Sequence, residues 1–313
     1  MKSISISRAK TWKECKLNYN YLYENKFTPK DKQPVFVTVK GTVLHETFEH
    51  LLKFENYVNE NPQLPYRVVD WNYASSVLIE AIKKNQLPRK EVEEFNLPLG
   101  LKRWLSFKHD YLDKTGHVLY AEKQYNEILF GETKTITILD LLEDCGDGTY
   151  NIYDYKTPKT TDTSRYKEQL TLYAYVMACV KGIIQPGSTE YEKVVQHFRL
   201  FVFFPLVEGD FETYQGCLKQ CKFTVKDVQN VIEQLQKTCS EIDTFNFNVP
   251  AEVLQPVKLP FQCRWCDYYG SKPQMDIHSE KGQPFYGCPI TAFMNNTPRN
   301  TEFIPTPART YST

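Results

Sequence analysis

The chain has 313 residues, and its 38 lysines and arginines are balanced by 38 aspartates and glutamates. This length suffices for one large domain or two smaller ones, and a hydrophobic content of 41% excludes disorder as the dominant state. The most apolar stretch, residues 200–207, is too short to cross a bilayer, and residues 1–12 lack the apolar core of a secretory signal, so we expect a cytoplasmic protein without a membrane segment.

Charge is distributed unevenly despite the neutral total. Residues 1–40 contain nine lysines and arginines against three acidic residues, whereas residues 122–154 contain eight acidic residues against two lysines. A basic arm beside an acidic centre suits a metal-dependent enzyme that acts on a polyanion. Either half alone is more typical of an ordinary solvated surface.

Helical spacing of apolar residues predicts four helices in the first part of the chain, at residues 3–26, 41–57, 70–85 and 99–113. Ser5 or Ser7 can cap the first of them. Three β-rich runs follow, at residues 118–129, 133–143 and 149–156. Gly131 separates the first two runs and a turn over residues 145–148 separates the last two, which predicts an antiparallel meander.

The chain then alternates between helix and strand. The predicted elements are a helix at 163–181 that Gly182 can end, an apolar strand at 194–206 and a helix at 225–242. We expect an α/β fold with a mixed central sheet, a helical N-terminal cover and a cysteine-bearing C-terminal segment. The expected divisions are a helical region, a core, a cysteine segment and a flexible tail, at residues 1–115, 116–245, 246–294 and 295–313.

The strand at residues 149–156 ends in Asp154-Tyr155-Lys156. Because side chains alternate along a strand, Asp154 and Lys156 point to the same face, and Asp140 in the preceding strand can lie close to Asp154. Two carboxylates can hold a hard divalent cation, and an adjacent ammonium can orient or polarise an attacking water. Taken alone, this short pattern is more typical of a surface ion pair.

Further polar residues accompany this pattern. His45 lies one helical turn after Gly41, and a neutral imidazole is a suitable metal ligand, although an isolated histidine on an amphipathic helix is usually structural. Glu122 lies near the start of the first strand of the meander. Gln169 and Tyr173, spaced i to i+4, share a face of the helix that follows Lys156.

These motifs resemble those of the PD-(D/E)xK nuclease superfamily, and specifically its RecB-like branch. That branch carries a helix with G-x-x-x-H, a strand pair ending in G-x-x-D and then D-Y-K-T, and a Q-x-x-x-Y helix. The matching residues occur in that order, as Gly41 and His45, Asp140, Asp154 to Thr157, then Gln169 and Tyr173. One departure is Thr137, where the family often has glycine, and it removes no ligand. The resemblance covers about residues 3–290 and implies a restriction-endonuclease-like core.

The resemblance also implies a role for each matched residue. The ligands of a Mg²⁺ or Mn²⁺ ion would be His45, Asp140, Asp154 and the backbone carbonyl of Tyr155. Lys156 would be the catalytic lysine, and Glu122 would help to bind metal or water. Gln169 and Tyr173 would position the nucleic-acid backbone or Lys156. The implied reaction is hydrolysis of a phosphodiester bond by metal-bound water.

The chain has nine cysteines, and this odd number in a sequence without a secretory signal argues against a disulfide framework. Cys263 and Cys266 form a C-x-x-C pair, which is a spacing typical of metal or redox sites. Here the chain is similar to the CRISPR-associated iron–sulfur exonucleases, which use one cysteine before the core and three after it. That similarity implies a [4Fe–4S] cluster held by Cys15, Cys263, Cys266 and Cys288.

The last of these cysteines departs from the family pattern. Its usual position, six residues after the pair, is occupied by Lys272, and 21 residues separate Cys266 from Cys288. The alternative is a tetrahedral Zn²⁺ ion bound by Cys15, Cys263, Cys266 and either Cys288 or His278.

The resemblance implies a metal-dependent DNA exonuclease that acts on single strands or free ends, in replication, recombination or repair. Two alternatives stay open, a structure-specific DNA endonuclease and a non-catalytic DNA-binding or mediator protein on the same fold. The complete set of Asp140, Asp154 and Lys156 argues against the non-catalytic alternative. The sequence has no Walker A pattern, so a helicase or recombination protein would be a separate partner.

Overall fold

The structure is a computed structural model. It describes residues 3–29, 36–61, 69–115, 117–130, 133–209, 211–247 and 277–279. The chain forms two compact units, a core unit of residues 1–3 and 36–233 and a terminal unit of residues 4–35 and 234–313. These units group residues by their contacts in space, so the predicted four-segment division along the sequence stays a prediction.

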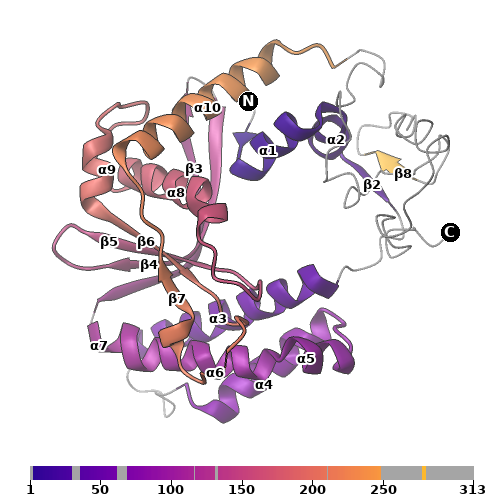
Figure 1. The fold of residues 1–313 in the computed structure, drawn as a ribbon, viewed down its shortest axis with the longest axis vertical. Coiled ribbons are helices and arrows are strands. Elements are labelled where there is room, and N and C mark those ends of the chain that lie inside the picture. The colour runs from indigo at the N-terminus through magenta and orange to yellow at the C-terminus, as the bar shows by residue number, and fades with distance from the viewer. Residues whose placement is uncertain are drawn as a thin grey trace. The chain divides into compact units, whose positions relative to one another are not determined.

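A six-stranded mixed sheet lies at the centre of the core unit (Figure 1). Its strands are β1 (Ser3–Ile4), β3 (Val118–Phe130), β4 (Thr133–Asp144), β5 (Tyr150–Tyr155), β6 (Phe198–Phe203) and β7 (Leu218–Gln220). The order is β1-β4-β5-β6-β7, and β3 also pairs with β4. Pairing is antiparallel for β3–β4, β4–β5 and β6–β7 and parallel for β5–β6, which confirms the predicted meander and the mixed sheet.

Helices cover both faces of this sheet. Those between β1 and β3 are α3 (Phe36–Glu60), α4 (Trp71–Lys84), α5 (Arg89–Phe95), α6 (Leu97–Phe107) and α7 (Asp113–Thr115). Between β5 and β6 lie α8 (Lys167–Val180) and α9 (Tyr191–His197). After β7 comes α10 (Val225–Thr244), which continues into the terminal unit from Gln234. Figure 1 shows α3, α4 and α6 together on one side of the sheet and α8 on the other.

Aromatic side chains join α3 and α6 to the middle strands. The Phe48 ring stacks on Trp104 with centroids 4.9 Å apart and meets Tyr155 of β5 edge-on at 5.3 Å. Phe107 stacks on Phe203 of β6 at 4.8 Å. Such rings bury large apolar areas, so they fix these helices against the ends of β5 and β6. On the other face, α8 is buried all round, from Leu170 to Ala178.

Several predicted elements differ in detail from the observed ones. The predicted strand 194–206 is wrong at its start, because α9 extends to His197 and only 198–203 form β6. The short α5 escaped prediction because it contains no buried residue and so has no apolar stripe. The helix predicted at 99–113 gives way to a π-helical turn at Lys108–Leu112. Gly182 follows the end of α8 with a φ of 70°, as predicted.

The terminal unit contains α1 (Ile6–Glu14), α2 (Lys16–Tyr19), a π-helical turn (Asn20–Glu24), β2 (Phe27–Pro29) and β8 (Ile277–Ser279). Ser5 caps α1 by accepting a hydrogen bond from the Arg8 N–H, and the predicted single helix is broken at Cys15, whose backbone is extended. Trp12 is buried against Phe245, and β2 pairs antiparallel with β8. Among the described residues, no helix is long and apolar enough to cross a membrane.

Candidate active site

The predicted acidic residues meet where β5 ends beside the middle of β4. In the β4–β5 register Leu141 faces Tyr153, so Asp140 and Asp154 are the next residues along each strand. The Tyr155 N–H donates a hydrogen bond of 2.6 Å to Asp140 Oδ2. Lys156 Nζ lies 3.0 Å from Asp154 Oδ1 and 2.8 Å from Oδ2, so Asp154 and Lys156 share one face as predicted.

His45 connects α3 to this strand end. Its Nδ1 lies 3.1 Å from Asp140 Oδ1, and its Nε2 lies 2.9 Å from the Tyr155 carbonyl oxygen. One turn earlier, a Cβ atom at Gly41 would lie 3.4 Å from Thr157 Oγ1, so α3 approaches the segment after β5 closely at this position. The structure therefore brings His45, Asp140 and the Tyr155 carbonyl into direct contact.

Burial and neighbouring charges together shift the pKa values of Asp154, Lys156 and His45. Burial raises the pKa of Asp154 to about 6, because the carboxylate is 2% exposed, and the charge of Asp140 adds to this effect. Burial lowers the pKa of Lys156, but the charges of Asp154 and Asp140 outweigh it and leave that pKa raised. Burial likewise lowers the pKa of His45, and its hydrogen bond to Asp140 outweighs that effect. The acids thus favour the protonated forms of both Lys156 and His45.

The donor atoms of this group suit a hard divalent cation. They are two carboxylates, a backbone carbonyl and an imidazole, and oxygen-rich sets of this kind favour Mg²⁺ or Mn²⁺. Asp154 Oδ2 is buried and, although close to Lys156 Nζ, has no donor in hydrogen-bonding geometry among the described residues. That oxygen therefore has coordinating capacity to spare. Both nitrogens of His45 have protein partners, so His45 would have to release one contact to bind an ion.

Helix α8 brings two further predicted residues to the sheet. Gln169 Nε2 donates a hydrogen bond of 2.5 Å to the Tyr173 hydroxyl, so the two residues share a helix face as predicted. Burial, and then the charge of Asp154, raises the pKa of Tyr173, and Asp140 adds to this effect. The Tyr173 phenol is therefore close enough to feel the charge of both acids.

Glu122 lies on β3 beside Asp140. Its neighbours Ala121 and Lys123 pair with Leu141 and Leu139, which places the Glu122 backbone next to Asp140 in the register. The Glu122 side chain lies outside the described residues, and its predicted role stays a prediction.

Sequence reasoning missed Tyr166, which lies in the 3₁₀ turn (Ser164–Tyr166) before α8. Lys156 Nζ lies 5.3 Å from the centroid of the Tyr166 ring, which is cation–π distance. The ring also packs against Phe204 at 6.1 Å. A tyrosine three residues before Gln169 carries no motif of its own, so only the fold could identify it.

The predicted cluster cysteines fall mostly outside the described residues, which contain Cys15 but not Cys263, Cys266 or Cys288. Cys15 is half-buried between α1 and α2, and its Sγ accepts a hydrogen bond of 3.4 Å from the Asn18 N–H. Burial raises the pKa of this thiol. The backbone of His278, the alternative zinc ligand, pairs with Thr28 in the β2–β8 ribbon.

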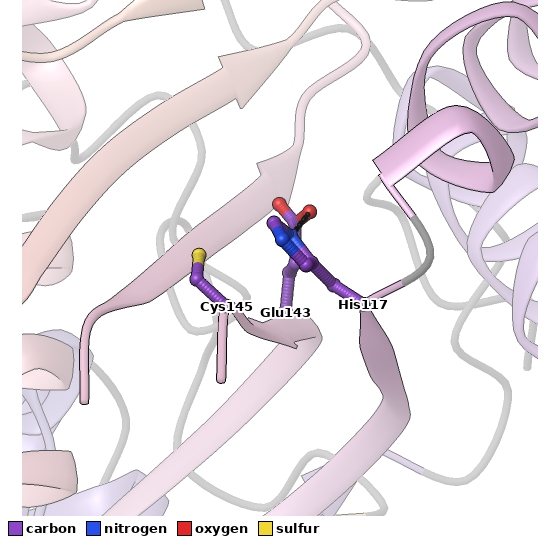
Figure 2. Close-up of side chains that lie close together, drawn as sticks. All are labelled: His117, Glu143 and Cys145. Atoms are coloured by element: carbon purple, nitrogen blue, oxygen red, sulfur yellow. Dashed lines mark hydrogen bonds and ion pairs between the residues drawn. The ribbon is translucent and has the colours of Figure 1, made fainter. Parts of the chain in front are cut away.

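A second group of metal-ligating side chains also escaped sequence reasoning. His117, Glu143 and Cys145 offer ligand atoms that all lie within 4.8 Å of one another (Figure 2). His117 precedes β3, and Glu143 and Cys145 lie at the end of β4. Because His117 lies 26 positions before Glu143 and 28 before Cys145 in the sequence, no local spacing indicates the group.

Comparison with known families gives one match. The sequence model of a family described as the PD-(D/E)XK nuclease superfamily matches residues 3–270. The matched range contains His45, Asp140, Asp154, Lys156 and the Gln169–Tyr173 pair, and it ends before Cys288. A search of curated proteins gives no match to the chain.

Proposed function

The chain belongs to the PD-(D/E)XK nuclease superfamily, and from this membership we propose that it is a metal-dependent DNA exonuclease acting on free ends. The single observation that carries the proposal is the group of Asp140, Asp154 and Lys156 at the end of β5, beside the middle of β4. The close approach of Gly41 to Thr157, the contact of His45 with the Tyr155 carbonyl and the Gln169–Tyr173 pair support a place in the RecB-like branch.

The divalent ion would be held by Asp140, Asp154, the Tyr155 carbonyl and His45. When bound, such an ion supplies an activated water and neutralises charge that develops on the phosphate. Lys156 stays protonated at neutral pH because the two acids raise its pKa, so it acts as a fixed positive charge and not as a base. Its ion pair with Asp154 and the ring of Tyr166 hold the ammonium in place.

Residues of α8 complete the proposed site. Because the Gln169 amide donates to the Tyr173 oxygen, the Tyr173 hydroxyl proton stays available to another acceptor. That acceptor would be a phosphate oxygen of the substrate, which would orient the scissile bond. Glu122 would contribute to binding metal or water from the neighbouring strand.

The proposed substrate is DNA, with single strands or free ends preferred, in replication, recombination or repair. The excess of positive charge in residues 1–40 supports a contact with the phosphate backbone. A separate helicase or recombination protein would supply unwound strands, and the reaction would take place in the cytoplasm. A structure-specific endonuclease would use the same chemistry, but DNA would reach its active site without a free end.

Digestion of matched DNA substrates separates these activities. End-labelled linear and circular DNA, single- and double-stranded, should be incubated with Mg²⁺ or Mn²⁺ and sampled over time. We expect linear single strands to be degraded progressively from an end and circular single strands to persist. Circular strands that are cut as fast as linear ones would exclude the exonuclease and favour the endonuclease.

We further propose that Cys15, Cys263, Cys266 and Cys288 hold a [4Fe–4S] cluster. The pairing of β2 with β8 and the contact of Trp12 with Phe245 support this proposal, because both bring the N-terminal segment to later parts of the chain. Protein purified without oxygen should contain iron and acid-labile sulfide in equal amounts, and Cys15→Ser should lose both. Colourless protein with one zinc per chain would instead indicate the tetrahedral zinc site.

A further inference from the structure

Three side chains of different metal-binding chemistry converge where β3 begins and β4 ends. Val118 pairs with Asp144, so His117 and Cys145 are the next residues on the two strands. Glu143 lies two positions before Cys145 and therefore on the same face of the sheet. All three side chains project to one side (Figure 2), and their ligand atoms lie within 4.8 Å of one another.

Glu143 is the buried member of the group. It is 0% exposed, and its Oε2 accepts hydrogen bonds of 2.7 Å from Asn151 Nδ2 and 2.6 Å from the Tyr153 hydroxyl. Its Oε1 lies 2.7 Å from His117 Nδ1. Burial raises the pKa of Glu143, but these hydrogen bonds outweigh burial and leave the pKa lowered, so the carboxylate is charged at neutral pH.

We propose that His117, Glu143 and Cys145 form a second metal site, which binds Zn²⁺. One nitrogen, one oxygen and one sulfur ligand together match the preferences of Zn²⁺, whereas Mg²⁺ and Mn²⁺ avoid sulfur. Zinc bound at about 2.0–2.3 Å from each ligand keeps ligand atoms roughly 3.3–3.7 Å apart, so small side-chain rotations suffice to form the site. A water would fill the fourth position.

The protein also supplies the surroundings that such a site needs. Asn151 and Tyr153 hold the second oxygen of Glu143, and outer hydrogen bonds of this kind orient metal-ligating carboxylates. The His117 side chain is 31% exposed and Cys145 is half-buried, which gives an ion a route from solvent. Binding releases the thiol proton of Cys145, and the proton between His117 and Glu143 moves to the other ring nitrogen or to solvent.

The proposed zinc site lies apart from the proposed nuclease site. Asp140 and Glu143 are three residues apart on β4, so their side chains point to opposite faces of the sheet. Zinc would connect the residue before β3 to the turn between β4 and β5. The bound ion would therefore stabilise the strand that carries Asp140, and it would do so whether or not the chain is an exonuclease.

Metal titration of the full chain tests this proposal. Protein stripped with a chelator should be titrated with Zn²⁺, and then with Co²⁺ as a spectroscopic probe for thiolate ligands. Cys145→Ala and His117→Gln should each bind one equivalent less of tightly held metal than the wild type. Their affinity for Zn²⁺ at this site should fall by more than the ~10–100-fold typical of changes to residues that only hydrogen-bond to a ligand. Cys145→Ala should also reduce the thiolate-to-cobalt absorption relative to the wild type.

Two further variants separate metal binding from folding defects. Cys179→Ala is the matched control, because Cys179 is another half-buried thiol and lies on α8 outside the group. It should keep the full metal content. Tyr153→Phe removes one hydrogen bond to Glu143 and should weaken zinc affinity by about 10–100-fold without abolishing it.

All these variants retain the C-terminal cysteines. The difference in bound metal between Cys145→Ala and Cys179→Ala therefore contains no contribution from metal bound to those cysteines. Zinc should raise the Tm of the wild type and of Cys179→Ala, and it should not raise the Tm of Cys145→Ala by the same amount. Equal metal content and equal cobalt spectra in Cys145→Ala and Cys179→Ala would overturn the proposal, even if the chain proves to be an active nuclease.

Discussion

Asp154→Asn is expected to reduce DNA cleavage by about a thousandfold while the protein stays folded and still binds DNA. Asparagine keeps the shape of the side chain but removes the charge that pairs with Lys156 and that would hold the divalent ion. Single-turnover cleavage of end-labelled single-stranded DNA measures the loss. DNA binding is measured separately with Ca²⁺ in place of Mg²⁺.

Lysine variants provide the matching control. Lys156→Met should lose cleavage to a similar extent, because it removes the ammonium beside both acids. Lys193→Gln removes a half-exposed lysine of α9 that pairs with Glu190, and it should retain full activity. If Asp154→Asn and Lys156→Met cleave as fast as Lys193→Gln, the group of Asp140, Asp154 and Lys156 is not the nuclease site.

The pH dependence of cleavage gives an independent measure of the same carboxylate. Because burial raises the pKa of Asp154 to about 6, this group takes up a proton at a pH where an exposed aspartate stays charged. Cleavage should therefore fall as the pH drops through about 6. A higher Mg²⁺ concentration should move the fall to lower pH, since metal and proton compete for Asp154. A rate that is unchanged from about pH 5 to about pH 8 contradicts this role.

The candidate site was predictable where it depends on local periodicity. Asp154 and Lys156 share a face because side chains alternate along a strand, and Gln169 and Tyr173 share one because they are a helical turn apart. Asp140 could be predicted to lie near the strand of Asp154, because the turn residues between the two strands indicate an antiparallel hairpin. These parts depend on geometry within one element or between neighbouring elements.

The remaining parts depend on register and on packing between distant segments. Tyr166 reaches Lys156 only because the turn before α8 folds over the strand end. His117 meets Cys145 only in one particular β3–β4 register, and a shift by one residue would separate them. The start of β6 was mispredicted because the apolar run around Val194 fits a helix as well as a strand.

Arg103→Met is expected to lower the free energy of unfolding by about 3–5 kcal/mol. Arg103 lies on α6 and is 1% exposed. Its guanidinium donates hydrogen bonds of 2.8–3.0 Å to the backbone carbonyls of Pro205, Val207, Gly209 and Phe211. Methionine fills a similar volume but leaves these acceptors without their donor. The carbonyls of Pro205 and Val207 are buried, and buried unpaired carbonyls are strongly destabilising. Urea unfolding followed by circular dichroism measures the change.

The neighbouring Lys102 is the control for this substitution. Lys102 is about half-exposed and pairs with Glu212 at the surface, so Lys102→Met should change the stability by less than about 0.5 kcal/mol. Arg103→Lys should also be destabilised, because a single ammonium cannot span carbonyls that a planar guanidinium reaches. Equal stability of Arg103→Met and Lys102→Met would show that the four carbonyls find other donors.

The same substitution should also weaken the proposed active site. The segment that Arg103 holds follows β6, and its Glu208 N–H donates a hydrogen bond to the Lys159 carbonyl, three residues after Lys156. Loosening this segment removes support from the strand end that carries Asp154 and Lys156. We therefore expect Arg103→Met to need more Mg²⁺ for half-maximal cleavage even at temperatures where it is fully folded. A Mg²⁺ requirement equal to that of Lys102→Met would limit the role of Arg103 to stability.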